Sequence, residues 1–167
     1  MNTDTRLIPL TQGKFAIVDS IDYDWLMQWK WYAVRHRRKE CDDVWYACRN
    51  TVIDDRRRPI AMHQEISIRM QSPSEYLDHK DHDGLNNSRS NIRPCNSFQN
   101  IWNTSKRGNR SSRFKGVSLD KKRKKWGAII FCHGEQFHLG RFKSEWQAHL
   151  AYVEASEIVF GEFACCT

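Results

Sequence analysis

The sequence predicts an α+β protein built from two small parts, a β-rich N-terminal region and a three-stranded antiparallel sheet packed on one helix. Short runs of aromatic, β-branched or alternating apolar residues recur along the chain, and turn-forming residues separate them. One longer run with helical character follows Ser144 near the C-terminus. The length of 167 residues allows one ordinary domain or two compact ones and excludes a large catalytic barrel.

The N-terminal region reads as short elements in close succession. Residues 7–20 alternate around Gln12–Gly13, which predicts a β-hairpin, and Asp22 or Asp24 is expected to cap a short helix that runs through Trp29. The aromatic runs 29–36 and 44–52 predict two strands joined by a charged loop at 37–43. A third short strand leads to Met62, and a short helix from His63 ends near Ser72–Pro73.

Residues 77–103 are polar where the interior of a globular region would be apolar. Acids, imidazoles and carboxamides fill this stretch, and bulky apolar residues are almost absent before Ile92. Asp83–Gly84 and Asn86–Asn87 are turn formers, while Asn96 can cap a helix that begins at Ser97. The expected local fold is a strand, a long polar loop, a short strand and a helix, and a functional role explains the composition better than packing does.

This stretch resembles the HNH nuclease family, specifically its phage and intron-encoded branch. The matching residues are Asp78-His79, Gly84-Leu85-Asn86-Asn87, Asn91-Ile92-Arg93 and Asn100. The resemblance implies a ββα-metal finger at about 76–104 within a nuclease domain at 1–103. It also implies that His79 is the general base, that Asn91 is a catalytic-loop brace, and that Asp78 and Asn100 bind one divalent ion.

The chemistry of these side chains suits phosphodiester hydrolysis. An imidazole can accept a proton from water near neutral pH, and a carboxylate with a carboxamide offers the oxygen ligands that Mg²⁺ or Mn²⁺ prefers. We therefore expect one such cation in each active site. Successive strand residues point to opposite faces, so Asp78 and His79 are expected at a strand end or a bulge.

Other polar residues of the region are weaker candidates for the site. His63 is expected either to contact phosphate, to brace the site or to play a structural role, and His82 is expected to be a surface group or a phosphate contact. Asp81 and Asp83 are expected to shape the loop. Residues 104–112 are polar and basic without a hydrophobic period, which predicts a linker.

Positive charge belongs to the C-terminal part of the chain. Residues 1–103 hold 15 Lys and Arg against 14 Asp and Glu, whereas the remaining residues hold 12 against 6. Ten of those twelve cations fall between Lys106 and Lys125. Such a dense block is either a footprint for a phosphate backbone or a solvated basic loop.

The C-terminal part, 113–167, predicts three strands at 113–119, 126–132 and 135–142, then a helix that ends at Gly161. We expect Ser144 to cap the helix and its apolar stripe to be Trp146, Leu150, Val153 and Ile158.

This part resembles the APETALA/ethylene-response-factor DNA-binding domain. The matching residues are Phe114-Lys115-Gly116-Val117, Trp126-Gly127-Ala128, His138-Leu139-Gly140-Arg141-Phe142, Ala151-Tyr152 with Ala155, and Phe160-Gly161-Glu162-Phe163-Ala164. In that family the sheet enters the major groove of DNA, although this sequence lacks most of the strand arginines. The DNA-binding residues that the resemblance implies are Lys115, Ser118, Trp126 and Arg141, with the turn residues Lys121, Lys122, Arg123, Lys124 and Lys125. Trp126 has an alternative role as a core residue beneath the sheet.

The resulting prediction is a metal-dependent DNA endonuclease that holds double-stranded DNA with its C-terminal domain. A monomer would nick one strand, whereas a double-strand break would need a homodimer or two sequential events. A homing role is a hypothesis that follows from the mobile-intron relatives. The rival functions are a catalytically silent DNA-binding regulator and an RNA-binding protein.

The sequence predicts a cytoplasmic protein, and the resemblance to the phage branch of the HNH family implies a bacterial or phage-infected cell. No apolar run is long enough to span a membrane, and no signal peptide is recognisable at the N-terminus. The six cysteines lack the spacing of a zinc ribbon or a disulfide framework, which predicts reduced thiols.

Overall fold

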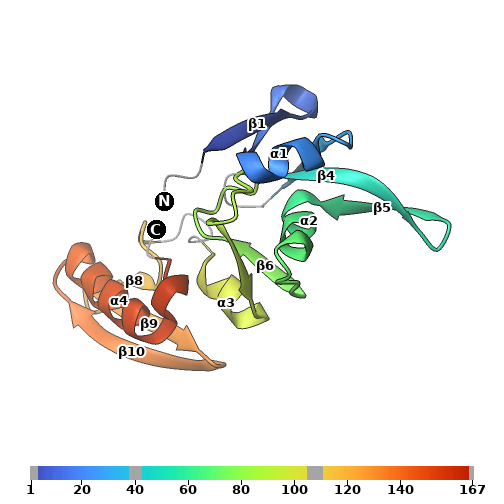
Figure 1. Ribbon diagram of the computed structural model, residues 1–167. Coiled ribbons are helices and arrows are strands. Elements are labelled where there is room, and N and C mark those ends of the chain that lie inside the picture. The colour runs from blue at the N-terminus through green and yellow to red at the C-terminus, as the bar shows by residue number, and fades with distance from the viewer. Residues whose placement is uncertain (1–3, 38–42, 105–110, 166–167) are drawn as a thin grey trace. The chain divides into compact units, whose positions relative to one another are not determined.

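The computed structural model describes residues 4–37, 43–104 and 111–165, which form a mixed α+β protein with several small antiparallel sheets. The predicted loop at 37–43 and the predicted linker at 104–112 lie largely outside the described residues. The described chain divides into two compact units, and the division between them follows Asn96. The predicted domain boundary at residue 103 stays a prediction. Figure 1 shows the order of the elements within each unit.

The first unit contains three small sheets and two short helices. A hairpin, a three-stranded sheet and a two-stranded ladder are all antiparallel. In chain order the elements are β1 (Thr5–Pro9), η1 (Thr11–Gly13), β2 (Phe15–Asp19), α1 (Ser20–Leu26), β3 (Tyr32–His36), β4 (Val44–Ile53), β5 (Arg56–Ala61), α2 (Met62–Arg69), β6 (Tyr76–His79) and β7 (Ile92–Cys95).

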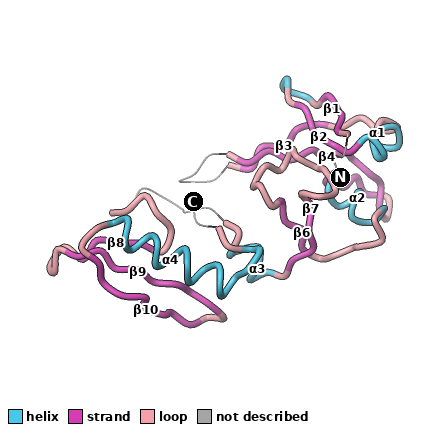
Figure 2. The backbone as a smooth tube through the Cα atoms, turned by 60° about the vertical axis from the view of Figure 1, so that its left-hand side comes forward, coloured by secondary structure: helices cyan, strands magenta, loops and turns pink. Residues whose placement is uncertain are grey.

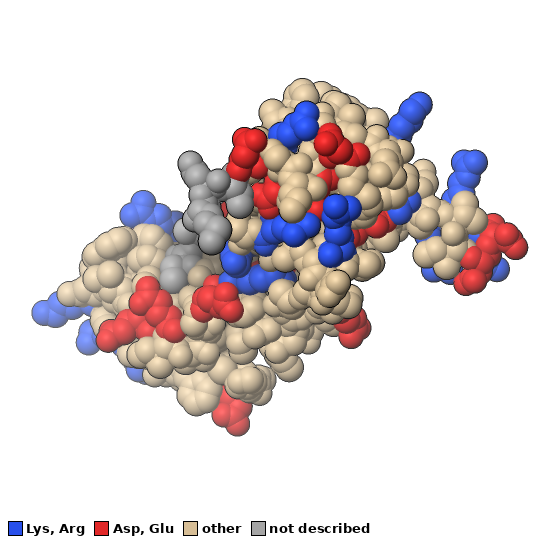
Figure 3. Space-filling model, viewed as in Figure 1, with Lys and Arg blue, Asp and Glu red and all other residues tan. Residues whose placement is uncertain are grey.

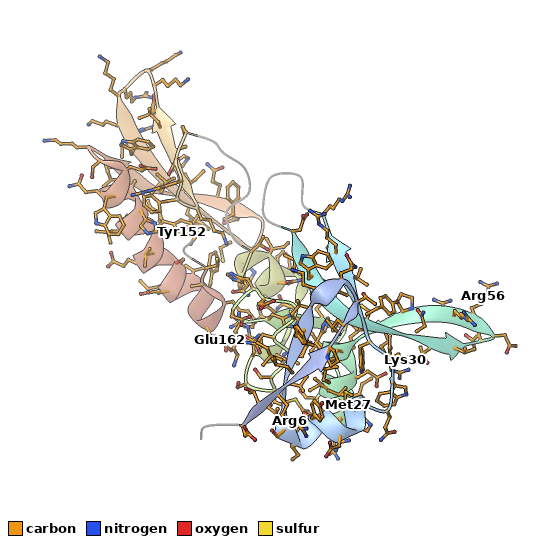
Figure 4. All side chains as sticks on the ribbon, turned by 90° about the horizontal axis from the view of Figure 1, so that it is seen from above. Arg6, Met27, Lys30, Arg56, Tyr152 and Glu162 are labelled. Carbon is orange, nitrogen blue, oxygen red and sulfur yellow. The ribbon has the colours of Figure 1, made fainter. Side chains whose placement is uncertain are left out.

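A single apolar core holds the first unit together. Its fully buried members come from the β1–β2 hairpin, α1 and α2, and aromatic side chains pack around them: the buried set includes Ile8, Val18, Leu26, Met62 and Ile66. The β4–β5 hairpin instead projects from this core (Figure 1), and Figure 4 places Arg56 at its far end. In Figure 3 the acidic and basic side chains of this unit are interspersed, as its near-neutral composition requires.

Helix α1 differs from the prediction at both ends. It begins at Ser20 and ends at Leu26, so it stops short of Trp29, and the residue before it is Asp19. The prediction that Asp22 or Asp24 caps this helix is wrong. Asp22 lies inside the helix with its carboxylate fully buried and bound by two arginines, which satisfies the carboxylate better than a helix end would.

The second unit is a three-stranded antiparallel sheet with α4 along one face (Figure 2). Its elements are α3 (Ser97–Trp102), β8 (Val117–Asp120), β9 (Lys125–Cys132), β10 (Glu135–Phe142), α4 (Glu145–Phe160) and η2 (Gly161–Phe163). The first strand begins later than predicted because Gly116 has a positive φ and meets the Tyr152 ring too closely to carry a side chain.

Helix α4 begins where the sequence predicts but buries a different face. Ser144 Oγ accepts a hydrogen bond from the Gln147 N–H at 3.2 Å, and the Gln147 side chain accepts one from the Ser144 N–H. The predicted apolar stripe is wrong, because Trp146, Leu150 and Ile158 are exposed. The buried residues are Ala148, His149, Tyr152, Ser156 and Phe160. Small side chains at Ala148 and Ser156 let the helix approach the sheet more closely than a stripe of large side chains would.

Candidate active site

The β6–β7 ladder places Asp78 and His79 as the last two residues of a strand. Across the ladder Asp78 pairs with Arg93, and His79 pairs with Ile92. Both side chains are buried, at 7% and 6% exposure. The chain leaves the strand immediately after His79, and this strand end is the position that two adjacent side chains need if both are to serve one site.

Asn91 braces the loop between the two strands. Its side-chain amide donates to Asp81 Oδ1 at 2.8 Å and to the Asn86 carbonyl at 2.7 Å, and its Oδ1 accepts from the Asp81 N–H at 3.1 Å. Burial opposes ionisation of Asp81, yet hydrogen bonds from Asn86, Asp83 and Asn91 lower its pKa. The ionised Asp81 carboxylate therefore links the two ends of the loop through hydrogen bonds.

Two further residues shape the loop. Asp83 Oδ1 accepts from the Leu85 N–H at 2.9 Å, which is an Asx turn. Gly84 lies against the Trp45 carbonyl and the Tyr46 ring, where a Cβ atom would clash, so glycine is required there. His82 adopts a positive φ in the same loop and is only partly buried. Its role as an accessory residue stays a prediction.

Aromatic rings surround the His79 imidazole. His63 of α2 meets it edge-on with ring centroids 4.9 Å apart, and Tyr46 of β4 lies 5.9 Å away. Burial lowers the pKa of His79, although the Asn87 side chain and nearby carboxylates act in the opposite direction. A neutral imidazole at neutral pH is the form that can accept a proton.

Arg93 is a site residue that the sequence-based assignment of roles left out. Its guanidinium donates to Asp78 Oδ2 from Nε at 3.0 Å and from Nη2 at 2.8 Å, and both side chains are buried. The signal was available, because Arg93 belongs to the Asn91-Ile92-Arg93 motif, but its partner depends on the register of the ladder. The pair gives the buried Asp78 carboxylate a counter-ion.

The assignment of Asn100 as a metal ligand stays a prediction. Asn100 lies on α3 in the second unit, and its side chain is exposed. Within the described ranges, no three His, Cys, Asp or Glu side chains gather into a metal-binding cluster. The oxygen donors of Asp78 and Asn100 are of the type that Mg²⁺ or Mn²⁺ prefers, which makes the chemistry of the donor set suitable.

His63 makes the stability of the first unit sensitive to acid. Burial, followed by the neighbouring His79, lowers the pKa of His63 to about 3, whereas an unfolded histidine titrates near 6.5. Between these values only the unfolded chain binds the proton, so the free energy of unfolding should fall as the pH falls, by about 1.4 kcal/mol per pH unit for this group.

The measurement is urea unfolding from about pH 6.5 to pH 5, where the two states differ in protonation. His63→Phe keeps a ring beside His79 but cannot bind a proton. The slope of its unfolding free energy against pH should therefore be smaller than that of the wild type by the contribution of about one proton. An equal pH dependence in the variant and the wild type would contradict a buried, neutral His63.

Strand register separates the predicted DNA-binding residues onto two faces of the second sheet. Ser118 and Arg141 both pair with Gly127 and are exposed. Trp126 pairs with Phe142 and packs with it in the apolar cluster that includes Ala148 of α4. Because neighbouring strand residues point to opposite faces, Ser118 and Arg141 lie on the face away from α4. Trp126 occupies the core position that was its alternative.

The remaining basic residues fall into two groups. Residues 121–125 are all exposed at the turn between β8 and β9, and Arg123 there also pairs with Asp120 at 2.9 Å. Lys115 instead donates from Nζ to the carbonyls of Trp102 and Thr104, each at 2.7 Å. The Lys115 ammonium thus holds the carboxyl end of α3, where carbonyl groups lack helical partners.

The chain is similar to a protein described as an uncharacterized HNH endonuclease from Acanthamoeba polyphaga mimivirus. The two are 34% identical over 100 residues, which cover 59% of this chain and 51% of that protein. The chain thus spans about half the length of this relative. No family model matches the sequence, and no solved structure matches the fold. None of the helices in the described ranges has the length and apolar character of a membrane-spanning helix.

Proposed function

We propose that the chain is a DNA endonuclease of the HNH type that depends on a divalent metal ion. The observation that carries the proposal is the end of β6, where a buried carboxylate and a buried neutral imidazole stand side by side beneath a loop braced by Asn91. The similarity to a protein described as an HNH endonuclease supports the same class of activity.

In the proposed reaction, His79 accepts a proton from the attacking water while the water oxygen forms a bond to phosphorus and the bond to the 3′ oxygen breaks. His63 and Tyr46 exclude bulk water from one side of the imidazole. Asp78 and Asn100 would hold the cation, which would supply positive charge to offset the negative charge on the phosphate and on the leaving oxygen. Asn91 keeps the loop in place during this step.

The proposed substrate is double-stranded DNA, held by the second unit. Ser118 and Arg141 share the face of the sheet away from α4, and residues 121–125 add exposed positive charge at one end of it. Phosphate contacts from such residues provide affinity that falls steeply with salt. Lys115 and Trp126 are poorer candidates, because the first binds backbone carbonyls and the second packs in the core.

The activity test is the relaxation of supercoiled plasmid DNA. We expect nicked circles with Mg²⁺ or Mn²⁺ and no cleavage when EDTA removes the cation, since the leaving oxygen then develops its charge uncompensated. Linear product formed with the first turnovers would indicate a homodimer, whereas nicked circles alone would indicate a monomer. Binding of DNA without cleavage under all these conditions would favour the catalytically silent regulator. Preferential binding of structured RNA at the same salt would favour the RNA-binding alternative.

A further inference from the structure

The N-terminal segment from Ile17 to Asp22 lies directly against the nuclease loop. The Ile17 N–H donates to the Leu85 carbonyl at 2.9 Å, and the Ile17 carbonyl accepts from the Asn87 N–H at 2.8 Å. These bonds form a parallel bridge between Ile17 and Asn86, the only one outside the named strands of the described chain. The middle of β2 therefore pairs, over a short stretch, with a loop that is remote in sequence.

An ion pair between a buried carboxylate and a partly exposed arginine continues this contact. Arg89 of the loop donates to both carboxylate oxygens of Asp22, each at 2.7 Å, and its backbone N–H donates to Asp19 Oδ2 at 2.8 Å. Asp22 is fully buried, and Arg69 of α2 also reaches it at 3.2 Å. The Asp22 hydrogen bond raises the pKa of Arg89, which remains a cation at any relevant pH. A planar guanidinium bound through two N–H groups to both oxygens of one carboxylate has a fixed direction as well as a fixed position.

The clamped loop residues are next to the groups proposed to act in catalysis. The backbone of Asn87 is held by Ile17, and its side chain is 1% exposed and donates from Nδ2 to the Leu85 carbonyl at 3.1 Å. The same side chain lies close enough to the His79 imidazole to favour its protonated form. Asn91 lies two residues beyond Arg89. Its carbonyl accepts a hydrogen bond at 3.0 Å from the N–H of Lys80, the residue directly after His79. Displacement of the loop at Arg89 would therefore disturb the position of His79 both through Asn87 and through the hydrogen bond between Asn91 and Lys80.

We propose that the segment Ile17–Asp22 is a clamp that sets the position of His79 through the loop, and that Asp22 and Arg89 are its positioning residues. The inference rests on the proposed nuclease function and adds a role for a part of the chain outside the HNH motif. The clamp contacts the loop at four points, from Leu85 to Arg89. Hydrogen bonds and a bidentate ion pair are directional, so they fix the loop backbone that carries Asn87 and the side chain of Arg89.

The test uses the full chain with Asp22→Ala and Arg89→Met combined. The double variant removes the buried Asp22 carboxylate together with the Arg89 guanidinium that pairs with it, and Asp19 keeps its hydrogen bond from the backbone N–H of residue 89, so the chain should fold. Arg69 stays satisfied because its side chain is 37% exposed to water. We expect the amide hydrogens of Asn87 and Arg89 to exchange with solvent at least about tenfold faster than in the wild type. The kcat of plasmid nicking should fall about tenfold or more with little change in KM.

The matched control is Arg6→Met combined with Asp24→Asn, which removes an exposed ion pair between β1 and α1. This control should leave both amide exchange and kcat unchanged. Unchanged exchange in the clamp variant would overturn the proposal, and so would faster exchange with an unchanged kcat. If the wild type does not cut DNA, the proposed function fails in that measurement, while amide exchange still decides whether the pair holds the loop.

Discussion

Replacement of His79 by alanine is expected to lower the rate of plasmid nicking by about 10² to 10⁴, the usual contribution of a positioned general base. The structure places this imidazole beside Asp78 and lowers its pKa by burial, so the wild-type group is neutral and able to accept a proton. DNA affinity should change little, because the proposed binding face belongs to the second unit.

The control for this variant is His133→Ala, which removes an exposed imidazole from the turn between β9 and β10. Nicking by this control should equal that of the wild type. Initial rates under saturating DNA give kcat for all three proteins, and filter binding without Mg²⁺ gives their affinities. Nicking that survives in His79→Ala at the wild-type rate would remove His79 as the base.

Replacement of Arg93 by methionine is expected to cost the first unit about 3 to 5 kcal/mol of unfolding free energy. The change keeps most of the apolar stem of the side chain but takes the guanidinium away from the buried Asp78 carboxylate. A buried charge that loses its counter-ion carries most of its desolvation cost, which is why this variant should exceed a typical core substitution in effect.

Urea unfolding followed by circular dichroism measures this loss. The double variant Arg93→Met with Asp78→Asn should recover much of the stability, because no carboxylate charge then remains in the interior. If the single variant were as stable as the wild type, the Asp78–Arg93 pair would not be the buried, mutually dependent pair that the ladder register indicates. The double variant would still be inactive, because the proposed metal ligand is gone.

Several elements near the candidate site were predictable from local sequence. The alternation around Gln12–Gly13 predicts the first hairpin, and the short helix after Met62 is confirmed, although it ends at Arg69. The spacing from Asp78 to Asn91 predicts two strands joined by a polar loop, and β6 and β7 are those strands. Turn formers and alternation act over a few residues, which is why sequence alone is sufficient for them.

Other features depend on partners that are distant in sequence. Arg93 can be recognised from sequence as part of the Asn91-Ile92-Arg93 motif. Its bond to Asp78 depends on the register of the β6–β7 ladder, which places the two residues opposite each other. Asp22 has the appearance of a helix cap in sequence, and only the folded loop brings Arg89 to it. The buried face of α4 was predicted wrongly because an apolar stripe indicates amphipathicity and does not reveal how closely a sheet will approach.

By itself, the sequence determined the class of this protein: an α+β chain with a polar, strand-flanked loop that carries an acid, an imidazole and carboxamides at nuclease-like spacing, and a basic C-terminal half. Only the tertiary structure decided which charges are buried together, which face of the second sheet is open, and which segment holds the loop. The physical reason is that side-chain type and spacing are local, whereas burial, strand register and ion pairing arise when distant segments meet.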